Sequence, residues 1–317
     1  MVTIDKIFHA SVVLKDIIRP TPLAKAYGIA EDCKLYLKPE CLQKTGSFKL
    51  RGSGYKIAML SEEEKARGVI ACSAGNHAQG VALAASKCGI SSLICLPDTA
   101  PISKVEATKG YGAQVCLVPG VYDDAYNRAL ELKEERGYTF VHPFDDEYVI
   151  SGQGTIGLEI MNEMSDVDAV IVPIGGGGLI SGVACAIKSI SPHVKVYGVQ
   201  AAGAPSMFNA VNHGHMEALE KVSTIADGIA VKKPGEITYE MVKNYVDDIA
   251  LVTEDEIAAA ILALIEKQKM IAEGAGAVSV AAAMFHKFPM GQPVSTSAEA
   301  SGTQQSHRPR PALQPSG

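Results

Sequence analysis

The sequence predicts an α/β protein in which mostly parallel sheets are flanked by helices. Short apolar strand patterns alternate with helical patterns from residue 69 to residue 142, with short glycine-containing connections. Such alternation is typical of parallel strands joined by crossover helices. A further apolar strand pattern at 168–174 runs into four consecutive glycines and then into another helical pattern. The length of 317 residues suggests about two domains.

The remaining elements follow from periodicity and capping signals. Ser61 with Glu64, and Thr253 with Glu256, form the capping-box pattern that begins a helix. The stretch from the strand at 195–200 to Asp227 is polar and irregular. We expect helices at 4–18, 48–60, 76–88, 101–109, 122–136, 254–269 and 273–285, and strands at 34–38, 69–72, 92–96, 114–118, 139–142, 168–174, 195–200 and 248–252.

Composition excludes several classes of protein. The net charge of −6 and the absence of a long basic cluster argue against a nucleic-acid partner. The seven cysteines include no C-x-x-C pair and fall mostly in apolar runs, which favours reduced core residues in the cytoplasm. No signal-peptide pattern and no apolar run of 18 residues occurs, so we expect neither secretion nor contact with a membrane.

The run 44–49, Lys-Thr-Gly-Ser-Phe-Lys, lies between a strand pattern and a helix pattern. Lys49 would stand at a helix start, where the helix dipole and free backbone N–H groups favour anions. A bound anion, or a neutral amine, would remove this conflict. The alternative is a solvated lysine whose stem lies along the surface.

The four glycines Gly175, Gly176, Gly177 and Gly178 connect a buried strand to a helix that begins at Leu179. Such a connection can hold a phosphate on backbone N–H groups, although a tight turn or close helix packing also explains it. The spacing fits neither the dinucleotide fingerprint nor a Walker loop. A lysine able to form a covalent bond with an aldehyde, a phosphate cradle and no metal motif together suggest pyridoxal 5'-phosphate.

Three motifs in order resemble those of the fold-type II pyridoxal phosphate enzymes: 44–51, the run 71–80 (Ala-Cys-Ser-Ala-Gly-Asn-His-Ala-Gln-Gly) and 173–182. The chain is most similar to the serine/threonine dehydratases (threonine ammonia-lyases) over about residues 16–289. The resemblance implies a two-domain, tryptophan synthase β-like fold. The implied division is a large cofactor-binding domain at 1–46 and 147–290, a small domain at 47–146 and a tail at 291–317.

The resemblance also implies roles for individual residues. Lys49 would bond to the cofactor aldehyde and remove the Cα proton of the substrate, helped by a lowered pKa, and Phe48 would pack against the cofactor ring. The glycines 175–178 and Leu179 would hold the phosphate. The residues of one loop would bind the substrate carboxylate: Ser73, Ala74, Gly75, Asn76 and His77.

Several of these residues have a simpler explanation as well. Asn76, which binds the cofactor ring oxygen in the family, could be a helix N-cap. His77 could be an ordinary helix histidine. Glu273, which lies near the ring in relatives, could be a charge that favours the start of a helix. Asp227 matches a segment that holds a cation in some relatives, but the sequence shows no ligand cluster, so a metal site is left undecided.

Ala74 favours elimination over racemisation. Relatives that racemise serine carry a hydroxyl residue at this position as the base on the opposite face of the cofactor, and alanine has no proton to exchange. The implied activity is dehydration and deamination of L-threonine to 2-oxobutyrate and ammonia, with L-serine as a second substrate. The alternatives are a serine racemase, a β-replacement synthase or an inactive fragment. We expect a small amino-acid substrate, a homodimer or homotetramer, and no nucleic-acid or membrane partner.

The C-terminal segment departs from the family pattern. Relatives continue after the last helix with a buried strand whose end carries a Ser or Cys that hydrogen-bonds the cofactor ring nitrogen. Residues 291–317 are rich in Ser, Gln, Pro and Gly and contain few apolar side chains, so we expect a disordered, non-native tail. We therefore expect the last strand to be missing, which would expose sheet edges and weaken cofactor binding.

Overall fold

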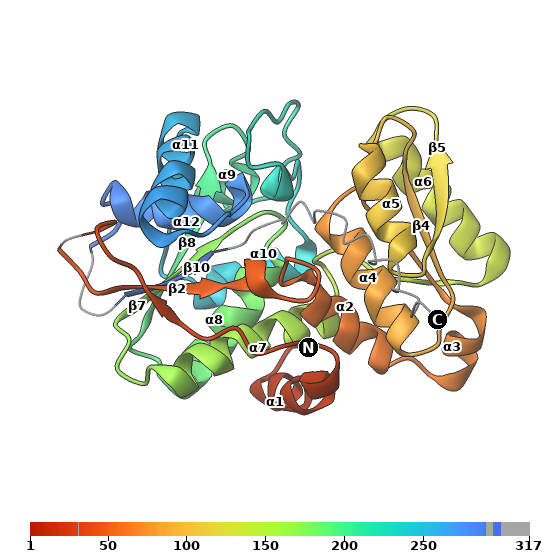
Figure 1. Ribbon diagram of the computed structural model, residues 1–317, viewed down its shortest axis with the longest axis horizontal. Helices are drawn as coiled ribbons and strands as arrows, with labels where there is room; N and C mark the ends of the chain where they lie inside the picture. Colours follow the sequence, from red (N-terminus) through yellow and green to blue (C-terminus); the bar gives the residue numbers. More distant parts are fainter. Residues whose placement is uncertain (31, 290–293, 299–317) are drawn as a thin grey trace, which may run out of the picture.

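The computed structural model describes residues 1–30, 32–289 and 294–298. It contains two sheets that lie side by side, each with its own helices (Figure 1). Helix α2 (Lys49–Ala58) packs against α4 (Asn76–Lys87) of the smaller half and against α7 (Glu147–Glu163) of the larger half. The predicted α/β architecture with mostly parallel sheets is confirmed. The proposed domain boundaries near residues 47 and 146 remain a prediction.

The larger sheet has six strands in the order β1-β2-β10-β7-β8-β9. All its neighbours are parallel except β1, which pairs antiparallel with β2. Its strands are β1 (Ala24–Lys25), β2 (Leu35–Pro39), β7 (Ala169–Pro173), β8 (Lys195–Ala201), β9 (Asp248–Val252) and β10 (Val294–Ala298).

Alternate residues of the central strands face two separate cores, as the period of two requires. Ile171 and Val199 belong to the core formed with the last helices, whereas Val170 and Val196 belong to the core formed with α8. Burial on both faces explains why these strands are continuous apolar runs in the sequence. The helices of this half are α1 (Ile4–Val13), α7, α8 (Gly178–Ile190), α9 (Ser206–His213), α10 (Glu236–Tyr245), α11 (Glu254–Ala263) and α12 (Gly274–Met284), with short turns η1 (Leu14–Asp16), η2 (Glu40–Leu42), η3 (Asp227–Ile229) and the π-helical η4 (Leu264–Gln268).

The smaller sheet has four parallel strands in the order β5-β4-β3-β6. Its faces also alternate: Ala71 and Ile94 pack toward α4, while Ile70 and Cys95 pack toward α6. The strands are β3 (Val69–Cys72), β4 (Ser92–Pro97), β5 (Gln114–Val118) and β6 (Thr139–Phe140), and the helices are α2, α3 (Glu62–Arg67), α4, α5 (Ile102–Gly110) and α6 (Tyr122–Arg136).

Most predicted elements are confirmed to within a few residues, and both capping boxes are present. The helix expected at 254–269 is α-helical only to Ala263 and continues as η4. Helices α9 and α10 were not predicted: α9 lies in the stretch up to Asp227 that we interpreted as irregular, and no element was assigned between that stretch and the strand at 248–252. No helix among the described residues is long and apolar enough to cross a membrane. The seven cysteines are free thiols: Cys33, Cys72, Cys95 and Cys185 are buried, Cys41 and Cys116 are half-buried, and Cys88 is exposed.

Helix α7 is the largest element that the sequence did not predict. Three glycines and several β-branched residues give it low helix propensity, and burial on nearly all sides removes the amphipathic period. The glycines permit close packing: a Cβ on Gly152 would lie 2.5 Å from the Arg51 carbonyl oxygen, and one on Gly157 would lie 2.9 Å from that of Val183. Tertiary contacts with α2 and α8 therefore stabilise this helix more than its own sequence does.

The expectation that the last strand is missing is wrong. Strand β10 (Val294–Ala298) pairs in parallel with β2 on one side and with β7 on the other, so it fills the centre of the larger sheet. The prediction gave weight to polarity alone, whereas ladder hydrogen bonds come from the backbone and Val and Thr have high β propensity. The rest of the predicted tail, 291–293 and 299–317, lies outside the described residues.

Candidate active site

A cleft of about 1060 Å³ lies at the carboxyl ends of strands from both sheets. This is the edge at which open α/β sheets usually bind their ligands. The structure brings every residue that the sequence singled out for substrate or cofactor binding to this one cleft. They are Phe48, Lys49, Ser73, Ala74, Gly75, Asn76, His77, Gly175, Gly176, Gly177, Gly178, Leu179 and Glu273.

Lys49 is the first residue of α2, as predicted. Its Nζ donates a hydrogen bond to the carbonyl oxygen of Pro143 at 3.1 Å and lies 5.1 Å from the centroid of the Phe48 ring. The N-cap residue Phe48 makes no side-chain hydrogen bond, the Ser47 Oγ accepts a long one of 3.3 Å from the Lys49 backbone N–H, and no acidic residue lies in the first turn. The lysine therefore reaches the cleft from an unfavourable position for a cation, so an anionic ligand nearby would stabilise it. Its lowered pKa remains a prediction.

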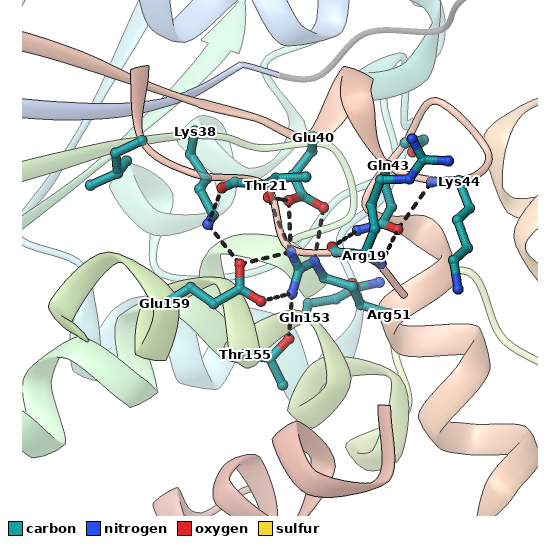
Figure 2. Close-up of polar contacts among 12 residues, drawn as sticks. Arg19, Thr21, Lys38, Glu40, Gln43, Lys44, Arg51, Gln153, Thr155 and Glu159 are labelled. Carbon is teal, nitrogen blue, oxygen red and sulfur yellow. Dashed lines mark hydrogen bonds and ion pairs between the residues drawn. The ribbon is translucent and has the colours of Figure 1, made fainter. Parts of the chain in front are cut away.

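Arg51 lies behind Lys49, two residues further along the same helical turn, and is fully buried. Its guanidinium makes two-pronged contacts with Glu40, at 2.8 and 2.8 Å, and with Glu159, at 2.5 and 2.9 Å (Figure 2). The Oγ1 atoms of Thr155 and Thr21 accept two more hydrogen bonds, at 3.1 and 3.3 Å. Burial disfavours the charge, but the two carboxylates more than offset it and raise the pKa of Arg51.

Lys38 extends this buried cluster. Its Nζ lies 2.6 Å from Glu159 and donates to the Thr21 carbonyl oxygen at 2.5 Å (Figure 2). The cluster therefore joins three elements that are far apart in the sequence: the end of β2, the first turn of α2, and α7. Because the contacts are short, buried and mutually bonded, they fix the start of α2 relative to the larger sheet.

The glycine run forms the opposite wall of the cleft. Gly177 has a φ of 98°, which favours glycine, and α8 begins at Gly178 without a side-chain cap. A Cβ on Gly176 would lie 2.4 Å from the Phe144 ring, so this position needs glycine for close packing as well. The first N–H groups of α8 have no intrahelical acceptor. The wall can therefore receive a phosphate, and its glycines serve packing and binding together.

The loop after β3 contains the predicted carboxylate-binding residues. Helix α4 begins at Asn76 itself, and Gly75 is the N-cap, so the N-cap interpretation of Asn76 is wrong. Asn76 instead donates a hydrogen bond from Nδ2 to Oε1 of Glu273 at 2.7 Å, across the cleft. Gly75 N–H donates to the Ser73 Oγ at 3.1 Å. Glu273 does stand at a helix start, as the N-cap residue of α12, but its side chain makes no capping hydrogen bond to that helix.

His77 is buried, and its Nε2 lies 2.8 Å from the carbonyl oxygen of Val141. A carbonyl only accepts, so Nε2 carries the proton and Nδ1 has a free lone pair. Nδ1 is buried without a hydrogen-bond partner among the described residues. Burial, with help from the charge of Lys49, lowers the pKa of His77 to about 3. His77 is therefore a neutral histidine at the edge of the site.

Sequence reasoning missed several residues that line the cleft. His142 and Phe144 follow strand β6, and their signal was available: a histidine before a proline at the carboxyl end of a parallel strand. Two ion pairs cross the mouth of the cleft: Lys104 to Asp227 at 3.3 Å, and Lys232 to Asp123 at 3.9 Å. Asp227 thus pairs with a lysine. The described residues contain no group of three or more potential metal ligands.

Comparisons with known proteins agree with this geometry. Residues 14–295 match the family model described as "Pyridoxal-phosphate dependent enzyme". An L-threonine ammonia-lyase of Thermotoga maritima is 55% identical over 286 residues, which are 90% of this chain and 71% of that protein. The catabolic L-threonine dehydratase TdcB of Escherichia coli is 47% identical over 289 residues, which are 90% of this chain and 88% of that protein.

Two solved structures are similar over nearly the whole chain. Maize serine racemase gives a TM-score of 0.92 at 34% identity, covering 95% of this chain and 93% of that one. The processed threonine deaminase isoform 2 of Solanum lycopersicum gives a TM-score of 0.89 at 39% identity, covering 95% and 91%. From the matched family model and from relatives at these identities, the chain belongs to the family of pyridoxal-phosphate dependent enzymes.

Proposed function

We propose that this protein is a lyase that dehydrates and deaminates L-threonine to 2-oxobutyrate and ammonia. The fold alone does not separate this activity from racemisation, because a serine racemase and a threonine deaminase are similar to the chain to nearly the same degree. Curated relatives at 47–55% identity are named threonine ammonia-lyase or dehydratase. The single observation that carries the choice is Ala74, which puts a methyl group in the cleft where racemising relatives have a hydroxyl.

The residues of the cleft fit pyridoxal phosphate. The N–H groups at the start of α8 would hold its phosphate, Lys49 would bond to its aldehyde, and Asn76 and Glu273 would lie beside its ring. When bound, the cofactor supplies a π-system that delocalises the charge formed at Cα of the amino acid. Gly176 supports this assignment, since a side chain there would collide with the Phe144 ring that lines the cleft beside the glycine run.

The chain's own residues would perform the remaining steps. The backbone N–H groups of the loop 73–77, at the start of α4, would bind the substrate carboxylate. The neutral amine of Lys49 would then remove the Cα proton, and the β-hydroxyl would leave. The buried cluster around Arg51 would keep Lys49 in place during these steps.

L-serine, which lacks only the β-methyl group of threonine, would be a second substrate. Free thiols at all seven cysteines support a cytoplasmic location, and a homodimer or homotetramer is the assembly we expect. The family's ring-nitrogen partner lies at the end of the last strand, so an inactive chain remains the alternative to test.

The test uses purified protein with pyridoxal phosphate. We expect an absorption band of the lysine-bound cofactor, 2-oxobutyrate from L-threonine, and pyruvate without D-serine from L-serine. Lys49→Ala should lose the band and both products, whereas Lys44→Ala, in the same motif but outside the residues that line the cleft, should keep them. D-serine without pyruvate would replace the proposal by a racemase, and a band without any product would indicate an inactive chain.

A further inference from the structure

His142 lines the cleft directly after strand β6. Its Nδ1 accepts a hydrogen bond from the backbone N–H of Asp145 at 2.7 Å and a longer one from that of Phe144 at 3.3 Å. A ring nitrogen that accepts hydrogen bonds carries no proton, so in the neutral ring the proton lies on Nε2. The local backbone therefore fixes the tautomer of this histidine.

The ring is also held neutral. Burial is the main cause that lowers the pKa of His142, and the charge of Lys49 acts in the same direction, while Asp145 and Asp146 oppose them. Because the ordinary histidine value is about 6.5, a lowered pKa leaves the ring uncharged at neutral pH. The ring of Phe144 packs against it edge to face, with centroids 4.7 Å apart, and limits its rotation.

The Nε2–H group has no acceptor among the described residues. It belongs to the same wall of the cleft as Lys49, because the next residue, Pro143, accepts the hydrogen bond from the lysine Nζ at 3.1 Å. His77, the other cleft histidine, uses its Nε2–H on the Val141 carbonyl oxygen. Of the two histidines, only His142 can donate to a ligand.

We propose that His142 Nε2–H donates a hydrogen bond to the β-oxygen of the amino-acid substrate and holds this oxygen while the Cβ–O bond breaks. The inference rests on the proposed function and deepens it. Threonine has three polar groups, and the proposal assigns two of them: the carboxylate to the loop 73–77 and the amine to the position of Lys49. The β-hydroxyl is the third, and His142 offers it a neutral donor that is fixed in orientation and lies on the same wall as Lys49.

The elimination of water from the substrate needs no additional reagent. Lys49 takes the proton from Cα, the electron pair of the Cα–H bond forms the Cα–Cβ double bond, and the electron pair of the Cβ–O bond leaves with the oxygen. The proton that Lys49 has taken then neutralises the departing hydroxide, which becomes water. His142 stabilises the charge that develops on the oxygen and keeps its own proton, so it acts as a hydrogen-bond donor.

Two substitutions separate the two nitrogens of the ring. His142→Asn keeps an acceptor near the Nδ1 position, which can still bind the backbone N–H of Asp145, but its shorter amide places no donor at the Nε2 position. His142→Gln keeps a donor near the Nε2 position. L-threonine is compared with β-chloro-L-alanine, whose chloride leaves without help from a hydrogen-bond donor. We expect His142→Asn to lower kcat for L-threonine about a hundredfold. The same substitution should change kcat for β-chloro-L-alanine by less than about threefold. His142→Gln should restore much of the kcat for L-threonine that His142→Asn loses.

An equal loss with both substrates, or no loss with either, would overturn this inference while the proposed function stands. If the unsubstituted holoenzyme converts β-chloro-L-alanine but not L-threonine, the proposed function fails instead. Binding gives a readout without turnover: α-methyl-L-serine has no Cα proton, and 2-aminoisobutyrate differs from it only by lacking the hydroxyl. His142→Asn should weaken the binding of α-methyl-L-serine and leave that of 2-aminoisobutyrate unchanged. Equal weakening of both, or ¹⁵N NMR showing the proton on Nδ1 of His142, would contradict the assignment.

Discussion

The two ends of the cleft hold opposite charges together in different ways. Behind Lys49, Arg51 is fully buried and binds two carboxylates through paired contacts of 2.5 to 2.9 Å (Figure 2). At the mouth, each lysine meets one carboxylate at 3.3 or 3.9 Å, and the side chains of Lys104 and Asp227 are 37% and 65% exposed. The buried, paired contacts of the first arrangement restrict its geometry more than the longer, exposed single contacts of the second do.

The difference follows from what each end must do. Breaking a buried pair leaves an uncompensated charge and costs several kcal/mol, whereas an exposed pair contributes about 0–1 kcal/mol. The start of α2 must keep its position if Lys49 is to reach the same atom in every turnover. The mouth joins the two halves of the molecule, so weak pairs there allow a substrate to enter at little cost.

The largest effect should come from removing the buried cation. Arg51→Met leaves the buried Glu40 without its cation and leaves Glu159 with Lys38 alone, and we expect the free energy of unfolding to fall by about 3–5 kcal/mol. Urea denaturation followed by circular dichroism measures it. Arg128→Met is the matched control, because Arg128 pairs with two glutamates on the exposed face of α6, and it should cause no measurable change. Equal effects of the two substitutions would remove the contrast between buried and exposed pairs.

A smaller effect should appear on acidification. Burial disfavours the charged form of Glu159, but Arg51 and Lys38 outweigh it and lower its pKa. A carboxylate with a lowered folded-state pKa stabilises the protein above its unfolded value, about 4.3, and this contribution is lost as the pH falls through the folded-state value. The stability difference between the unsubstituted protein and Glu159→Gln should therefore shrink between pH 6 and pH 3. In an Arg51→Met background the same comparison should have a shallower slope, because only Lys38 is left to lower the pKa of Glu159. An unchanged slope there would show that Arg51 does not contribute to the effect.

Local signals made most of the fold predictable. Strands β3, β5 and β9 and helix α6 have the predicted bounds, because apolar runs, turn residues and caps agree in those segments. Helix α7 was missed because its stability comes from packing of its glycines against Arg51 and α8, which no local pattern reports. Strand β10 was missed because its place depends on the backbones of β2 and β7.

The site was predictable in its residues and less so in its geometry. Each motif predicted one wall of the cleft, since strand ends and helix starts meet at one edge of a parallel sheet. The partners of Arg51 could not be predicted, because Glu40 and Glu159 are separated from it by 11 and 108 residues and only the folded chain brings them together. The role inferred for His142 needed the Asp145 N–H, whose direction a sequence does not give.

The smallest effect should come from the mouth. Lys104→Ala removes a single exposed pair between α5 and η3, so the free energy of unfolding should change by less than about 1 kcal/mol. Because that pair joins the two halves, we expect pyridoxal phosphate to bind the apoprotein somewhat faster, as measured by stopped-flow absorption, and the difference to vanish at high salt, which screens exposed charges. Lys109→Ala is the matched control, since Lys109 pairs with Glu106 within the same helix and this pair does not join the two halves of the molecule. If Lys104→Ala instead cost several kcal/mol, or if both variants changed the rate equally, the mouth would be as rigid as the cluster behind Lys49.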